Sequence, residues 1–187
     1  MAGAIFLDRD GVLCEHRSTY VKEWQEFRWI PGARKALRIL AGLGLPLVMV
    51  TNQSAVNRGL TTMERVNDLH RRMQRAIQQG HGRLDAIYVC PHRSDEGCAC
   101  RKPGLLLFHR AATELGIDFA RSYLIGDSLS DLQAGWDLNL QVILVLTGFG
   151  EETAARLDGA ARRVPILNNV LEAARAIEAG CKQEVRS

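Results

Sequence analysis

The stretch AIFLDRDG, residues 4–11, decides the fold that this sequence predicts. Its first four residues form an apolar run of the length expected for a buried strand. Asp8 and Asp10 follow at once, and Gly11 permits a sharp turn. In parallel α/β sheets, ligands bind beyond the carboxyl ends of the strands, so an acidic segment at this point indicates a functional site.

Strands and helices alternate along the rest of the chain. We expect further strands at residues 45–50, 86–89, 123–125 and 142–146, with a short one at 164–167, and helices at 31–43, 61–77, 105–115, 129–138 and 169–179. Thr61 and Glu64 match a capping box at the start of the second helix. This order predicts an α/β fold, a Rossmann-like three-layer α/β/α arrangement with a mainly parallel sheet.

Length and composition favour one domain. The chain has 187 residues, of which 47% are hydrophobic, enough for a full core. We expect a single domain over residues 1–180 without a separate cap domain, followed by a tail at 181–187. No apolar run approaches a membrane span, and the net charge of +3 is too dispersed to indicate nucleic acid. The N-terminus shows no basic leader or cleavage site, so we expect a cytoplasmic monomer without membrane or nucleic-acid partners.

Three polar segments, each following an expected strand, are predicted to converge at one edge of the sheet. They are residues 8–11, 51–54 and 126–128. Their carboxylates would repel one another unless a hard cation joined them, and Mg²⁺ accepts such ligands together with phosphate oxygens. Each Asp alone is also suited to capping a helix, and for Asp131 both interpretations stay open.

A cluster of thiols and one imidazole predicts a structural zinc site. Its members are Cys90, His92, Cys98 and Cys100. Four such ligands make a closed tetrahedral zinc site, and the polar loop between them would have no core of its own. The alternative is free thiols beside an incidental histidine. Cys14 and Cys181 lie outside the cluster and are expected to be free thiols.

These segments resemble the haloacid dehalogenase-like phosphohydrolase superfamily, and within it the phosphatases with a zinc loop that act on small phosphosugars. The segments that carry the resemblance are DRDGVL at 8–13, TNQS at 51–54, CPH at 90–92, CACRKP at 98–103 and GDSLSD at 126–131. The likeness runs from about residue 4 to residue 148.

The resemblance implies a role for each matching residue. Asp8 would be the nucleophile and Asp10 the general acid and base, while Thr51 and Lys102 would stabilise the phosphoryl group. Mg²⁺ would be bound by Asp8, the backbone carbonyl of Asp10, and Asp127, and the four-residue cluster would bind Zn²⁺. Substrate contacts are implied for Arg17, Ser18, Thr19, Tyr20, Asn52, Gln53, Ser54, Arg58 and Arg101.

The chain departs from the family pattern at three places. Cys14 stands where the family usually has Asn, Ala55 stands where it usually has Gly, and Gly104 follows Pro103 without an intervening Pro. The first two positions are expected to border the substrate pocket. The expected function is therefore a magnesium-dependent phosphatase for a small phosphosugar carrying two phosphates. Histidinol phosphate or another sugar phosphate is the alternative substrate, and a non-catalytic, zinc-stabilised binding module is the alternative from another class.

Overall fold

The computed structural model describes residues 2–159 and 163–184, which form one parallel sheet between two layers of helices. The strands are β1 (Ile5–Leu7), β2 (Leu47–Asn52), β3 (Ala86–Cys90), β4 (Tyr123–Gly126), β5 (Gln141–Val145) and β6 (Ile166–Leu167). The helices are α1 (Ala33–Ala41), α2 (Met63–Gln79), α3 (Leu106–Leu115), α4 (Leu129–Asp137), α5 (Gly150–Arg156) and α6 (Val170–Glu184), with short 3₁₀ helices at Trp24–Glu26 and Phe119–Arg121. The strand order is β3-β2-β1-β4-β5-β6, and every neighbouring pair is parallel.

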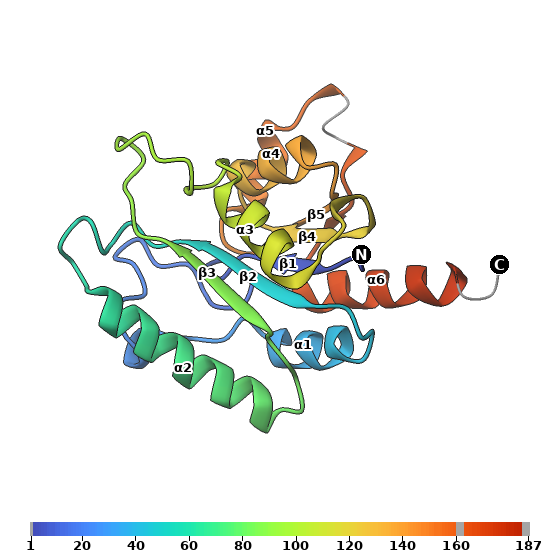
Figure 1. The fold of residues 1–187 in the computed structure, drawn as a ribbon, viewed down its shortest axis with the longest axis horizontal. Helices are drawn as coiled ribbons and strands as arrows, with labels where there is room; N and C mark the ends of the chain where they lie inside the picture. Colours follow the sequence, from blue (N-terminus) through green and yellow to red (C-terminus); the bar gives the residue numbers. More distant parts are fainter. Residues whose placement is uncertain (1, 160–162, 185–187) are drawn as a thin grey trace.

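Alternating side chains of the strands build two cores, one on each face of the sheet. Ile5 and Leu7 point into a core shared with α1, α2 and α6, whereas Phe6 points into a core shared with α3 and α4. Figure 1 shows α1, α2 and α6 below the sheet and α3, α4 and α5 above it. Because both faces are covered, β1 is apolar throughout rather than alternating. The predicted three-layer α/β/α fold is confirmed.

Three local features differ from the prediction. Helix α5 was not predicted, because the short segment Gly150–Arg156 is polar and carries no apolar periodicity. The N-cap of α2 is Thr62, whose hydroxyl accepts a hydrogen bond from the backbone N–H of Arg65. Thr61 instead donates its hydroxyl to the carbonyl of Lys22 at 3.1 Å. Helix α6 also continues past its expected end at residue 179, to Glu184.

The polar segments lie at the position in the sheet where the strand order reverses, between β1 and β4. The chain builds β1, β2 and β3 outward on one side and then returns to pair β4 with the other side of β1. Asp8 directly follows β1 and Asp127 directly follows β4, so the two acids leave adjacent strands at the switch point. Crevices at this position are the usual ligand sites of open parallel sheets.

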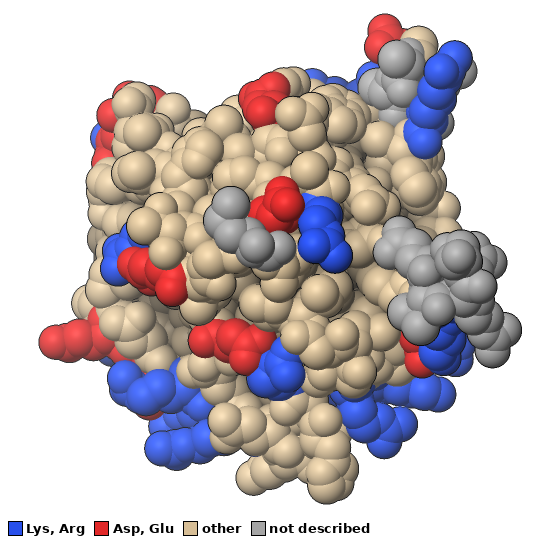
Figure 2. Space-filling model, turned by 45° about the vertical axis from the view of Figure 1, so that its right-hand side comes forward, with Lys and Arg blue, Asp and Glu red and all other residues tan. Residues whose placement is uncertain are grey.

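The surface carries mixed charge. On the face drawn in Figure 2, acidic and basic side chains lie interspersed among uncharged residues. Among the residues that the structure describes, no helix combines the length and the apolar character needed to span a bilayer.

Candidate active site

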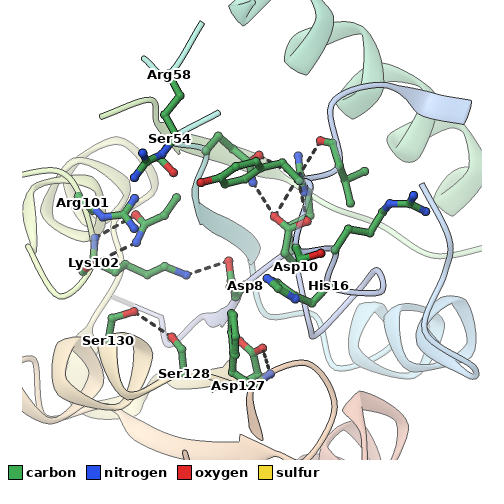
Figure 3. A pocket seen from close by; sticks show the side chains of 18 residues that line it. Asp8, Asp10, His16, Ser54, Arg58, Arg101, Lys102, Asp127, Ser128 and Ser130 are labelled. Carbon is green, nitrogen blue, oxygen red and sulfur yellow. Dashed lines mark hydrogen bonds and ion pairs between the residues drawn. The ribbon is translucent and has the colours of Figure 1, made fainter. Parts of the chain in front are cut away.

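A polar pocket of about 500 Å³ opens at the carboxyl ends of β1, β2 and β4. Figure 3 shows Asp8, Asp127 and Lys102 converging in it, with Arg58 and Arg101 at one side and His16 at another. The lining residues are Asp8, Arg9, Asp10, His16, Arg17, Ser18, Tyr20, Val21, Asn52, Gln53, Ser54, Arg58, Arg101, Lys102, Asp127, Ser128, Ser130 and Phe149.

Two carboxylates and one ammonium group line the base of the pocket, and the fully buried carboxylate of Asp131 lies next to them. Carboxylate oxygens of Asp8, Asp127 and Asp131 all lie within 4.8 Å of one another. Lys102 Nζ lies 2.8 Å from Asp8 Oδ1 and 2.6 Å from Asp131 Oδ1, and it donates a hydrogen bond to the carbonyl of Val50 at 2.8 Å. The ammonium group thus forms two ion pairs and one hydrogen bond within the protein, while Asp8 Oδ1 and Asp131 Oδ1 are buried and accept no hydrogen bond from the residues that the structure describes.

The electrostatics of this cluster fit a divalent cation. Burial raises the pKa of Asp8 to about 6, with the charges of Asp131 and Asp10 adding to it and Lys102 opposing it. Burial, followed by the charges of Asp8 and Asp131, raises the pKa of Asp127 to about 8. Three ionised carboxylates against one ammonium leave an excess of two negative charges. A hard dication with oxygen ligands neutralises that excess, so the donor set fits Mg²⁺.

The segment after β5 holds Asp127 in place. The backbone N–H of Phe149 donates to Asp127 Oδ2 at 2.8 Å, and the hydroxyl of Thr153 donates to the Asp127 carbonyl at 2.9 Å. Gly11 and Gly148 both have positive φ and approach this carboxylate so closely that a Cβ at either would overlap it. The sequence alone did not indicate residues 147–153, because Phe149 and Thr153 hold Asp127 through a backbone N–H and a hydroxyl, which no motif marks.

Asp131 has both of the roles that its sequence position left open. Its Oδ2 accepts hydrogen bonds from the backbone N–H and the hydroxyl of Ser128, at 3.1 and 2.6 Å, which completes a capping box at the start of α4. Its Oδ1 pairs with Lys102. The carboxylate therefore starts a helix on one side and joins the charged cluster on the other.

Asp10 points away from this cluster into a separate network. Arg9 Nη2 lies 2.9 Å from Asp10 Oδ1 and 2.8 Å from Oδ2, and Gln53 Nε2 donates to Oδ2 at 2.7 Å. Burial by itself raises the pKa of Asp10, but the Arg9 charge and these hydrogen bonds outweigh it and lower the pKa below its ordinary value. Gln53 Nε2 also donates to the Thr51 hydroxyl at 2.8 Å.

The four predicted zinc ligands come together. Cys100 Sγ lies 3.2 Å from Cys90 Sγ, 3.6 Å from Cys98 Sγ and 3.1 Å from His92 Nδ1. Ligands about 2.0–2.3 Å from a tetrahedral zinc lie roughly 3.4–3.8 Å from each other. The 3.6 Å separation falls in this range, as do 3.7 Å from Cys90 Sγ to Cys98 Sγ and 3.5 Å from Cys90 Sγ to His92 Nδ1, and the other two separations are a few tenths of an ångström shorter. Three thiols and an imidazole nitrogen are also the ligand chemistry that zinc prefers. The site fits structural zinc.

The cluster of three cysteines and His92 is linked directly to the pocket. Arg101 Nη1 donates to the His92 carbonyl at 3.2 Å. The backbone N–H of Lys102 donates to Asn52 Oδ1 at 3.0 Å, and Asn52 Nδ2 returns a hydrogen bond to the Lys102 carbonyl at 3.2 Å. The loop that follows the cysteines is therefore tied to the end of β2, which sets the position from which Lys102 reaches Asp8.

Most, though not all, of the expected site residues line the pocket. Thr51 is buried and Thr19 is exposed, and neither is among the lining residues. Six residues that do line it were not predicted as site residues: Arg9, His16, Val21, Ser128, Ser130 and Phe149. His16 and Phe149 contact each other with ring centroids 4.1 Å apart. They come from loops remote in sequence, so no spacing rule brings them together.

The two unusual residues near the motifs do not border the pocket as expected. Cys14 is fully buried beneath Asp10, with Cys14 Sγ 3.4 Å from Asp10 Oδ1. Ala55 is also buried, and neither residue is among those that line the cavity. Both departures from the family pattern therefore lie in the protein interior and not on the pocket surface.

Comparisons with known proteins agree with this geometry. A family model described as HAD-hydrolase-like matches residues 99–173. Curated relatives share 39–40% identity with the chain, so the chain belongs to the haloacid dehalogenase-like phosphatases.

The names of the relatives are more specific than the superfamily. The chain is 40% identical over 152 residues to the D-glycero-β-D-manno-heptose-1,7-bisphosphate 7-phosphatase of Bordetella bronchiseptica. This match covers 81% of this chain and 85% of the relative. It is 39% identical over 189 residues to the enzyme of the same name from Yersinia pestis, covering 96% and 97%. The crystal structure of D,D-heptose 1,7-bisphosphate phosphatase from B. bronchiseptica, complexed with magnesium and phosphate, superimposes with a TM-score of 0.88 at 35% identity, covering 95% of this chain and 99% of that one.

Proposed function

We propose that this phosphatase removes the 7-phosphate of D-glycero-D-manno-heptose 1,7-bisphosphate. The observation that carries the proposal is the cluster of Asp8, Asp127, Asp131 and Lys102 at the base of a pocket rimmed by arginines. Relatives that carry this substrate in their names match four fifths or more of the chain. The product would serve the synthesis of nucleotide-activated heptose for lipopolysaccharide or other surface glycans.

Asp8 and Asp127, with the backbone carbonyl of Asp10, would hold the Mg²⁺. The ion supplies positive charge that offsets the phosphoryl oxygens and keeps the neighbouring carboxylates ionised. A related phosphatase, that of B. bronchiseptica, was crystallised with magnesium and phosphate. Because Asp131 already pairs with Lys102 and caps α4, its part would be to fix the ammonium group beside Asp8.

The protein groups divide the chemistry between two carboxylates. Asp8 would attack phosphorus through a carboxylate oxygen, while the bond from phosphorus to the sugar oxygen breaks and Asp10 gives that oxygen a proton. Water would then attack phosphorus, Asp10 would take up the proton, and phosphate would leave with Asp8 regenerated. Lys102, 2.8 Å from Asp8, would stabilise the phosphoryl charge throughout.

Thr51 is proposed to act together with Gln53. The Thr51 hydroxyl accepts a hydrogen bond from Gln53 Nε2, which leaves its own proton free for an oxygen acceptor. Movement of Gln53 on substrate binding would turn that hydroxyl toward the phosphoryl group. Thr51 would thereby stabilise the same charge as Lys102.

The distal part of the substrate would meet the arginines of the rim. Arg17, Arg58 and Arg101 all line the pocket, and a guanidinium binds a phosphate through paired hydrogen bonds. Tyr20 and Ser54 also line the pocket and would offer hydroxyls to the sugar. A bisphosphate would therefore place one phosphate at Asp8 and the other at the rim.

Zinc is proposed to be structural. The four ligands leave no open coordination position, and the cluster lies behind Arg101 rather than in the cavity. The cytoplasmic location, the monomeric state, and the single domain over residues 1–180 also stay predictions.

A substrate panel tests the proposal. Phosphate release would be measured with Mg²⁺ for both anomers of heptose 1,7-bisphosphate, for heptose 7-phosphate, and for histidinol phosphate. The bisphosphate should give the highest kcat/KM, because only it occupies both the base and the rim. A higher kcat/KM for histidinol phosphate would contradict the heptose proposal and favour histidinol phosphate as the substrate.

A further inference from the structure

Arg9 stands between two acids in the sequence, yet its side chain is fully buried. Its guanidinium contacts four groups: Asp10, Gln53 Oε1 at 2.8 Å, the Val21 carbonyl at 3.4 Å and His70 Nε2 at 3.2 Å. A buried guanidinium is unusual and requires partners for both its charge and its hydrogens. Asp10 supplies the charge, so the other three contacts determine the direction of the guanidinium.

His70 is the most distant of these partners in the chain. It lies on α2, is 4% exposed, and holds Nη1 of Arg9, whereas Asp10, Gln53 and Val21 all contact Nη2. Burial and then the charge of Arg9 lower the pKa of His70 to about 3, with Asp10 opposing weakly. The imidazole is therefore neutral near pH 7, and its Nε2 accepts the hydrogen of Arg9 while Nδ1 keeps the proton.

The network leaves Asp10 little freedom. Arg9 Nη2 bridges both oxygens of the carboxylate, and Gln53 contacts both Arg9 Nη2 and Asp10 Oδ2. Rotation of the Arg9 guanidinium would break these contacts together. Since His70 is the partner of the other end of the guanidinium, it prevents that rotation.

We infer that His70 is a positioning residue for the acid–base step, acting through Arg9 on the carboxylate of Asp10. This inference rests on the proposed role of Asp10 as the group that protonates the leaving oxygen. No sequence motif marks His70, which is the one histidine on the amphipathic helix α2. A residue that only fills space beside Arg9 would affect stability but not proton transfer.

Leaving-group dependence distinguishes proton transfer from packing. A phosphate ester of a weakly acidic phenol needs a proton on its leaving oxygen, whereas an ester of a strongly acidic phenol leaves without one. The slope of log kcat/KM against phenol pKa therefore becomes steeper when the general acid is misplaced. Wild type, His70→Leu, His70→Gln and Asp10→Asn would be compared on one series of aryl phosphates with Mg²⁺.

His70→Leu should lose about ten-fold in kcat/KM on the least acidic phenol and less than about two-fold on the most acidic one, a fraction of the full effect of a general acid. His70→Gln keeps an acceptor near the position of Nε2 and should retain the wild-type slope. Asp10→Asn sets the steepest slope of the series. A His70→Leu slope equal to that of wild type, including a parallel loss on all esters, would overturn the inference.

Arg9→Lys decides the question if His70→Leu does not fold. The substitution keeps a positive charge beside Asp10 but cannot bridge Asp10 and His70 at once. A steeper slope supports the inference, and an unchanged slope contradicts it. Equal slopes for wild type and Asp10→Asn would instead remove the acid–base role proposed for Asp10.

Discussion

Raising the pH from 6.5 to 8 should destabilise the magnesium-free protein, and Asp127→Asn should abolish that dependence. Asp127 is 1% exposed, and burial together with Asp8 and Asp131 raises its pKa from 3.8 to about 8. The folded chain thus holds this proton more tightly than the unfolded chain. Its contribution to stability is complete below pH 3.8 and is lost as the pH rises through about 8.

The size of the effect follows from the two pKa values. The difference between about 8 and 3.8, at about 1.36 kcal/mol per pH unit, amounts to roughly 6 kcal/mol over the full titration. About 2 kcal/mol of this falls between pH 6.5 and pH 8, a substantial part of the ~5–15 kcal/mol that stabilises a domain. His70 acts in the opposite sense, because its lowered pKa adds stability as the pH rises, but that gain is nearly complete by pH 6.5.

Urea unfolding at the two pH values measures this loss. The buffers should be free of magnesium and contain no chelator, so that the proposed zinc site is not stripped of its metal. Saturating Mg²⁺ at pH 8 should restore more stability to wild type than to Asp127→Asn, because it binds the ionised cluster. Equal wild-type stability at both pH values, or an equal loss in Asp127→Asn, would refute the raised pKa of Asp127 and with it the expectation that the carboxylate cluster needs a cation.

Three further predictions concern the nucleophile, the zinc loop and the rim. Asp8→Asn should abolish turnover while the protein stays folded, since an amide fills the same space but is a poor nucleophile; activity above a few per cent by phosphate release would exclude Asp8. Elemental analysis should find one zinc per chain, lost in Cys100→Ser but retained in the control Cys181→Ser, and a zinc-free wild type would contradict the site. Arg101→Lys should raise KM about ten-fold for a sugar bisphosphate and less for a simple aryl phosphate, because Lys lacks the paired hydrogen bonds of Arg. An equal rise in KM for both substrates would mean that Arg101 contacts the reacting phosphate instead of the distal one.

The fold could be predicted from the sequence wherever an apolar run ended in a polar motif. Residues 4–7 before Asp8, and 123–125 before Asp127, indicate strands that carry acids to one edge, and the parallel pairing of β1 with β4 brings them together. The coming together of the three cysteines and His92 was predictable as well, because thiols and an imidazole within eleven residues are typical of a metal site. Helix α5 was not, since its stability comes from contacts that only the tertiary structure provides.

The residues that position the site from outside its motifs could not be predicted from the sequence. Arg9 looked like part of a motif, and only the structure shows its side chain turned inward toward His70, 61 positions away. The contact between His16 and Phe149 likewise joins two loops that are distant in the chain. Such pairs depend on how loops pack, which neither periodicity nor spacing encodes.

Phosphorus NMR of heptose 1,7-bisphosphate, incubated with the protein and Mg²⁺, tests the central claim most directly. The 7-phosphate signal should disappear as inorganic phosphate appears, the 1-phosphate signal should persist, and Asp8→Asn should leave both unchanged. Loss of the 1-phosphate, or release of the 7-phosphate by Asp8→Asn above a few per cent of the wild-type rate, would contradict the account.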